Sequence, residues 1–165
     1  MKNLLVSLVL ALFLVPLSLS AQTGTWTAVA SSGDIDEAAL GIFAVNGANL
    51  QHLGASVNSV VARYNVTNTF GGGVSDLPPW NTLELGYFDN TVNGGVRATL
   101  FQVDPCTGNL VALCTVGSQD AAAATCNKCS FTQQVDFGKF LYYVEVTIFR
   151  NVGNVFPAAR TLRIF

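Results

Sequence analysis

The amino-acid sequence predicts an all-β protein, an antiparallel β-sandwich of about eight to ten short strands. Three observations carry this prediction. One long segment alternates between two faces, several shorter segments do the same between Gly, Pro and Asn turns, and no sustained helical period occurs. Short strands spaced by turn signals are typical of sandwiches and barrels. The sequence contains no linker long enough to separate two domains, so we expect one domain over residues 22–165.

The longest strand pattern is KFLYYVEVTIFR, residues 139–150. Side chains alternate across a strand, so one face of this segment is wholly apolar or aromatic and the other is mixed. The apolar face is predicted to comprise Phe140, Tyr142, Val144, Val146 and Ile148. A strand this apolar belongs in the middle of a sheet, because an exposed edge of this kind would invite aggregation.

The first 21 residues have the pattern of a secretory signal peptide. Lys2 is followed by an apolar run over residues 4–15, then by Pro16 and small residues, with cleavage expected after Ser20 or Ala21. The run is shorter than the roughly 20 residues that span a bilayer. The sequence therefore predicts a protein of bacterial type that is secreted, periplasmic or at the cell surface, with no transmembrane segment after cleavage.

The segment from residue 31 to residue 54 has two interpretations. Asp34 followed by Glu37 resembles a helix capping box. Against this, Asn46-Gly47 is a strong hairpin signal, and folding about it pairs Phe43 with Leu50. We favour the hairpin, because the glycines within the segment weaken a helix.

The remaining elements follow from alternation and from turn residues. Strands are expected over residues 25–30, 56–67, 80–87, 96–104, 110–116 and 159–164, with a loop at 71–79, turns at 89–95, 105–109 and 151–157, and a loop or single helical turn at 119–125. Residues 131–137 lead through Gly138 into the central strand. This arrangement is that of immunoglobulin-like or jelly-roll-like sandwiches, although no motif ties the chain to one family.

Four cysteines, Cys106, Cys114, Cys126 and Cys129, lie close together in the sequence. The predicted signal peptide directs the chain to an oxidising compartment, where cysteines usually form disulfides. We therefore expect all four cysteines to be oxidised. Zinc binding and a redox-active Cys-x-x-Cys are the weaker alternatives. Four cysteines allow three pairings, and the sequence does not choose between them. Bridges that link the 105–109 hairpin to the 126–129 segment are compatible with its geometry.

Charge and motif content exclude several classes of function. The formal net charge is −2 and the Lys and Arg residues are scattered, which argues against nucleic acid as a partner. His52 is the only histidine, and no nucleophile motif accompanies it. We therefore expect no catalytic residues and no enzyme activity.

Two groups of residues are candidates for binding. Trp80, Tyr87 and Tyr143 could contact a ligand or partner, although Pro78, Pro79 and the neighbouring leucines favour Trp80 as a plug of the core. The acidic residues Asp34, Asp36 and Glu37 could hold calcium, but a solvated turn explains them better, because their spacing matches no EF-hand loop.

The sequence thus predicts a secreted, non-catalytic protein with a structural, adhesion or surface-binding role. Its partner would be a protein, a cell-surface or matrix component, or a polysaccharide. A carbohydrate-binding-module-like domain is the alternative, and two or more exposed aromatic side chains on one face would favour it. A small outer-membrane β-barrel is a second alternative.

Overall fold

The computed structural model describes residues 24–53, 57–71, 77–121, 123–152 and 155–165. The expected signal peptide lies outside the described residues. The described elements are β1 (Trp26–Val29), η1 (Ala30–Ser32), β2 (Asp34–Ile35), η2 (Glu37–Ala39), β3 (Phe43–Asn46), β4 (Asn49–His52), β5 (Val60–Val66), β6 (Thr82–Phe88), β7 (Gly94–Val103), β8 (Leu110–Gly117), β9 (Thr125–Ser130), β10 (Leu141–Arg150) and β11 (Ala158–Ile164). Both η elements are single turns of 3₁₀ helix.

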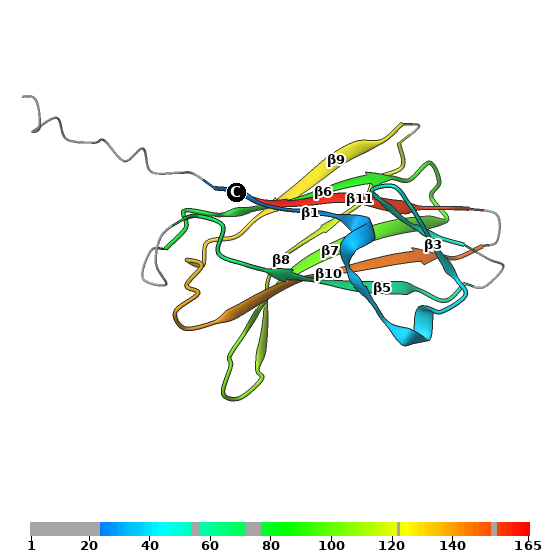
Figure 1. Ribbon diagram of the computed structural model, residues 1–165. Coiled ribbons are helices and arrows are strands. Elements are labelled where there is room, and N and C mark those ends of the chain that lie inside the picture. The colour runs from blue at the N-terminus through cyan, green and yellow to red at the C-terminus, as the bar shows by residue number, and fades with distance from the viewer. Residues whose placement is uncertain (1–23, 54–56, 72–76, 122, 153–154) are drawn as a thin grey trace, which may run out of the picture.

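The strands form two antiparallel sheets that pack face to face, not one sheet closed on itself (Figure 1). One sheet has the order β3-β4-β11-β6-β9, with β1 also paired to β11. The other has the order β2-β5-β10-β7-β8. The predicted antiparallel β-sandwich is therefore confirmed. Within the described parts of the chain, no helix has the length and hydrophobicity needed to cross a membrane.

The predicted central strand is the middle strand of the five-stranded sheet. Strand β10 pairs with β5 on one side and with β7 on the other. Its side chains alternate as expected, with Tyr142, Val144, Val146 and Ile148 buried and the residues between them partly exposed. Burying apolar surface stabilises the fold by about 25 cal/mol per Å², so this face fixes which side of the sheet turns inward.

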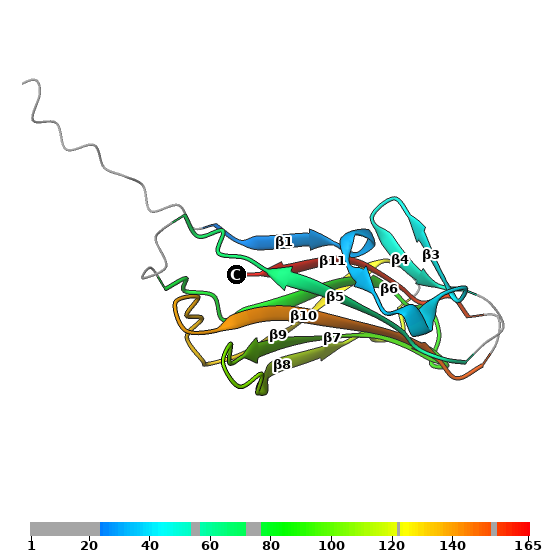
Figure 2. The same ribbon diagram turned by 60° about the horizontal axis from the view of Figure 1, so that its bottom comes forward.

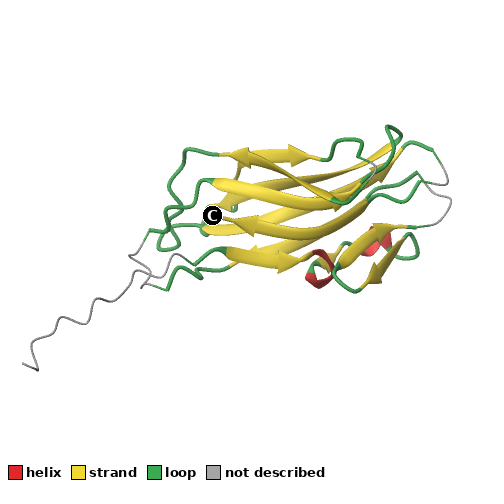
Figure 3. Cartoon of the chain, turned by 90° about the horizontal axis from the view of Figure 1, so that it is seen from above, coloured by secondary structure: helices red, strands yellow, loops and turns green. Residues whose placement is uncertain are grey.

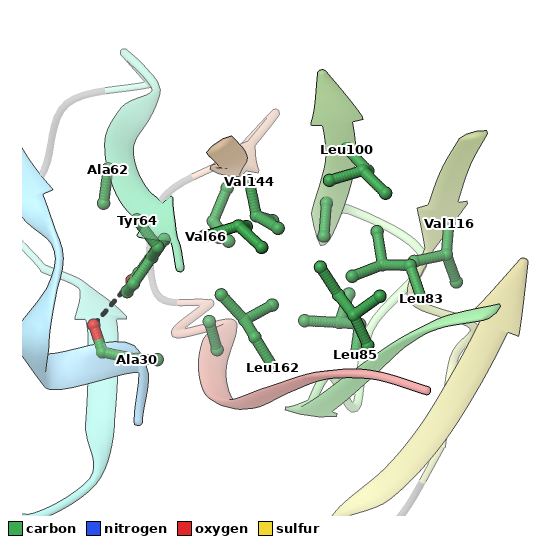
Figure 4. Packing of buried hydrophobic residues seen from close by; sticks show 14 of the residues in the cluster. Ala30, Ala62, Tyr64, Val66, Leu83, Leu85, Leu100, Val116, Val144 and Leu162 are labelled. Carbon is green, nitrogen blue, oxygen red and sulfur yellow. Dashed lines mark hydrogen bonds between the residues drawn. The ribbon is translucent and has the colours of Figure 1, made fainter. Parts of the chain in front are cut away.

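The core lies between the two sheets and draws on nearly every strand (Figure 4). Val144 and Leu100 from one sheet pack in the same cluster as Leu85 and Leu162 from the other. Tyr64, whose phenol is buried among these side chains, donates a hydrogen bond of 2.6 Å to the Ala30 carbonyl oxygen. That bond satisfies a group that would be costly to bury unpaired.

The hairpin in the N-terminal third is confirmed, but its register differs from the expected one. Phe43 pairs with His52 and Asn46 with Asn49, so Gly47 and Ala48 form the turn. Gly47 has φ +58°, which suits the first central position of a two-residue hairpin turn. The hairpin is preceded by the two 3₁₀ turns, drawn in red in Figure 3.

Strand β9 was not predicted as such. Residues 125–130, TCNKCS, hold few of the β-branched and aromatic residues that mark strands, and most of their side chains are exposed. The segment is a strand because it pairs with β6 at the edge of the six-stranded sheet. Residues 131–140 then cross to the other sheet and form no strand.

Only one disulfide forms, between Cys114 and Cys129. Leu100 and Leu83, the strand partners of these two cysteines, are buried, so the bond links the inner faces of β8 and β9 and joins the two sheets. Cys106 and Cys126 are free and exposed, which corrects the expectation that all four are oxidised. Cys126 lies three residues before Cys129, and an odd spacing along a strand places the two side chains on opposite faces.

Candidate functional site

The candidate site lies on the outer face of the five-stranded sheet, where cross-strand neighbours form two rows. In the first row, Arg63 of β5 stands opposite both Asp34 of β2 and Glu145 of β10. Its Nε donates to Glu145 Oε2 at 3.0 Å, and its Nη1 lies 3.6 Å from Asp36 Oδ2. Exposed ion pairs contribute at most about 1 kcal/mol each to stability, so their main effect is to hold the guanidinium in place.

The second row is aromatic. Tyr143 of β10 stands opposite Asn65 of β5 on one side and Phe101 of β7 on the other. The rings of Tyr143 and Phe101 are stacked, with centroids 5.1 Å apart and planes at 21°. Both side chains are partly exposed. The sheet therefore presents two aromatic rings on one outer face.

A hollow of about 580 Å³ opens beside this pair, lined by Asp34, Ile35, Asp36, Glu37, Arg63, Asn65 and Tyr143. The strand order places β5 and β2 on one side of β10 and β7 on the other. The Tyr143 ring therefore lies between Phe101 and the hollow. One side of the ring is covered by Phe101, and the other side borders polar groups.

The segment that carries the acidic residues is held against β5 by its backbone (Figure 2). The Asp36 N–H donates to the Val61 carbonyl oxygen at 2.9 Å, and its carboxylate caps η2 by accepting from the Ala38 N–H at 3.0 Å. At Gly33 the backbone lies directly on the Tyr64 ring, where an added Cβ would stand 2.5 Å from a ring carbon. A side chain at this position would force the segment or the Tyr64 ring to shift.

The Tyr143 phenol is a neutral hydrogen-bonding group. Burial raises its pKa, the Glu145 carboxylate raises it further, and Arg63 acts in the opposite direction. At neutral pH the group therefore keeps its proton and can donate a hydrogen bond.

The structure brings together two groups of candidates that the sequence kept apart, Tyr143 and the acidic segment. Among the described residues, no three carboxylate, histidine or cysteine side chains are placed to share one cation, and calcium binding by the acidic segment stays a prediction. Asp36 pairs with Arg63 and caps η2.

The other aromatic candidates are core residues. Trp80 is 4% exposed and Tyr87 is 2% exposed, so neither can be a stacking surface. Trp80 Nε1 donates to the Gly24 carbonyl oxygen at 2.8 Å, and the Tyr87 hydroxyl accepts from the Gln119 N–H at 3.1 Å. His52 is fully buried as well, with Nε2 hydrogen-bonded to the Asn58 carbonyl oxygen.

Sequence reasoning missed Arg63, Asn65 and Phe101 as site residues. A signal existed for each, because all three fall on the outward face of a predicted strand. What the sequence could not supply is the pairing of β5 with β10 and of β10 with β7, which alone places them beside Tyr143.

No protein-family model matches the chain, and no curated protein matches it. Among solved structures, it is similar at 14% identity and a TM-score of 0.42 to the CBM22-1–GH10 modules of Clostridium thermocellum endo-1,4-β-D-xylanase 10B complexed with xylohexaose, over 86% of this chain and 24% of that one. It is similar at 13% and 12% identity to structures of infectious bursal disease virus strains Gx and Gt, with TM-scores of 0.36 and 0.37. Those matches cover 86% of this chain and 31% and 32% of the viral chains. The chain thus spans less than a third of the length of each of these three structures.

Proposed function

We propose that this chain is a non-catalytic, secreted binding protein that attaches to a surface polysaccharide through the hollow beside Tyr143. One observation carries the proposal. The Tyr143 ring is backed by Phe101 on one side and borders a hollow lined with hydrogen-bonding side chains on the other. An adhesion or surface-coat role follows from such attachment.

The chemistry of the hollow suits a sugar ring. A rigid aromatic side chain offers large contact area to the apolar C–H face of a sugar. The Asn65 amide and the carboxylates of Asp34 and Glu37 supply donors and acceptors for hydroxyl groups around that face. Carboxylates outnumber the guanidinium of Arg63 here, so the proposed ligand is a neutral or amino sugar and not an acidic one.

The proposal of a role without catalysis rests on the sequence, in which His52 is the only histidine and no nucleophile motif accompanies it. The proposal of secretion rests on the predicted leader and is compatible with the Cys114–Cys129 disulfide, since such bonds persist in oxidising compartments.

The proposal is tested by binding of the mature protein to neutral polysaccharides, such as cellulose, xylan and chitin, and to a panel of soluble oligosaccharides. We expect Tyr143→Ala to weaken binding about tenfold, the effect of losing one good aromatic contact. Tyr143→Phe should retain most of the affinity, because stacking needs the ring. Thr147→Ala, on the same face but outside the hollow, is the matched control.

Two results would contradict the proposal. The first is a lack of binding to every neutral or amino-sugar polymer tested. The second is equal affinity for wild type and Tyr143→Ala, both with native melting temperatures. Either result would leave a structural role as the better account.

A further inference from the structure

The outer face of the six-stranded sheet carries two hollows that share one residue, Arg160. The larger, of about 430 Å³, is lined by Asn49, Gln51, Phe88, Phe156, Ala158 and Arg160. The smaller, of about 240 Å³, is bordered by Arg160 together with Thr161, Thr125 and Cys126. Arg160 thus borders both hollows, whose linings come from β4, β11, β6 and β9, and the two hollows together are referred to as the groove.

A β-bulge gives Arg160 this position. Along β11, Ala159 pairs with Tyr87 and Thr161 with the next residue, Gly86, so Arg160 is an extra residue in the ladder. Ala159 and Leu162 are fully buried, whereas Arg160 and Thr161 between them are both exposed. Bulges of this kind re-aim side chains, and they occur often beside binding sites.

Arg160 gives the groove its charge. Within the described part of the chain, the guanidinium of Arg160 forms no ion pair, whereas Arg163, three residues later, pairs with Glu84 at 3.1 Å. Among the described residues, neither hollow has an aspartate or glutamate in its lining. The groove is therefore complementary to an anion, in contrast to the hollow at Tyr143.

The other residues that line the two hollows can contact an apolar ring face and the polar groups attached to it. Phe88 is partly exposed and Phe156 is 42% exposed, so two aromatic side chains border the larger hollow. Asn49 and Gln51 add two amides. Both amide side chains are partly exposed, so their polar groups are available to a ligand.

We propose that this groove binds an acidic saccharide, a sugar whose ring carries a carboxylate. The Arg160 guanidinium would hold the carboxylate through two parallel N–H···O bonds, the geometry for which arginine is suited. The phenyl rings would contact the apolar face of the sugar, and the amides of Asn49 and Gln51 its hydroxyl groups. The site is separate from the one proposed above, on the other sheet and of opposite charge.

Calorimetric titration of the mature protein with polygalacturonate tests the proposal, and the methyl ester of the same polymer replaces each carboxylate with a neutral ester. We expect binding of the acid and at least tenfold weaker binding of the ester. Arg160→Gln should weaken binding of the acid by about tenfold or more, the effect of losing one charge-assisted contact. Arg163→Gln is the matched control, with the same charge change on the same strand, and should bind like wild type.

The two free cysteines supply a second readout in the same protein. Cys126 borders the smaller hollow, whereas Cys106 lies in the turn between β7 and β8. Polygalacturonate is expected to slow alkylation of Cys126 by iodoacetamide and to leave Cys106 unaffected. Equal protection of both thiols would indicate non-specific association and would overturn the proposal.

Three further results would also overturn it. One is equal binding of the acid and the ester, and another is equal weakening by Arg160→Gln and Arg163→Gln. The third is a lack of binding to all of polygalacturonate, alginate and hyaluronan at millimolar sugar concentration. If Tyr143→Ala weakens binding of the acidic polymer and Arg160→Gln does not, the acidic sugar binds in the hollow beside Tyr143. The proposal for the groove would then be wrong. The first three results leave the proposal of neutral-sugar binding at Tyr143 intact, whereas weakening by Tyr143→Ala would contradict the preference of that hollow for neutral and amino sugars.

Discussion

Trp80 lies at the end of the sandwich where residues 131–140 cross from one sheet to the other. Its ring meets Phe137 edge to face, with centroids 5.9 Å apart, and Phe137 meets Tyr142 of β10 in the same way at 5.2 Å. Nearby, the Gln134 side chain donates to the Pro78 carbonyl oxygen at 2.6 Å. Trp80 thus joins the crossing segment to the core by ring packing, and the hydrogen bond from Gln134 to Pro78 holds the same segment beside it.

Replacing Trp80 with alanine is therefore expected to cost about 3–5 kcal/mol of unfolding free energy, the usual range for a large buried aromatic side chain. Urea unfolding measures this loss, and Trp80→Phe should recover part of it. A variant with wild-type stability, combined with quencher-accessible tryptophan fluorescence in the parent protein, would show that the ring is at the surface.

Among the elements, β10 shows where sequence reasoning succeeds. Its two faces differ sharply in composition, so alternation alone predicts which side chains are buried, and the structure agrees from Tyr142 to Ile148. Strand β9 shows where it fails, because its side chains are mostly exposed and its position depends on β6 and the disulfide. The pairing within the β3–β4 hairpin depends on the position of its turn. Gly47 is the first central residue of that turn, whereas the sequence prediction made it the second.

Substitutions on the two faces of β10 are expected to differ in their effect on stability. Val144→Asp is expected to cost several kcal/mol, since Val144 is fully buried and a carboxylate there would have no partner. Thr147→Asp should change stability by less than about 1 kcal/mol, because Thr147 is on the outer face opposite Arg97. Melting temperatures measure both effects. Similar melting temperatures for the two variants would mean that the faces are assigned wrongly.

At the scale of the whole molecule, the site depends on contacts between residues that are distant in the sequence. Arg63 and Glu145 are 82 positions apart, and no local pattern predicts that they meet. The sequence alone predicts the class of fold, the central strand and two groups of residues that line the hollow, Tyr143 and the acidic residues of segment 34–37. The order of strands in each sheet decided which candidates became neighbours and which were buried.

The Cys114–Cys129 disulfide is the covalent link between the two sheets. Its cysteines are 15 positions apart in the chain, and closing a loop of that length stabilises a fold by about 3 kcal/mol in the chain-entropy account. A Cys114→Ser, Cys129→Ser double variant should lose stability of this order in urea unfolding. The Cys106→Ser, Cys126→Ser double variant is the control and should be close to wild type.

Thiol titration of the unfolded, unreduced protein adds an independent check. The structure leads us to expect two reactive thiols per chain, from Cys106 and Cys126. A count of zero would mean that these two cysteines are also oxidised. A count of four would mean that the link between the sheets is missing.

The central claim is that the outer face of the five-stranded sheet binds a neutral saccharide beside Tyr143. The most direct measurement is an NMR titration of the isotope-labelled protein with the oligosaccharide that binds best. We predict that the largest shift changes occur at Asn65, Arg63 and Tyr143, which line the hollow, and that they disappear in Tyr143→Ala. Shift changes confined to the six-stranded sheet, or none at saturating sugar, would contradict the claim.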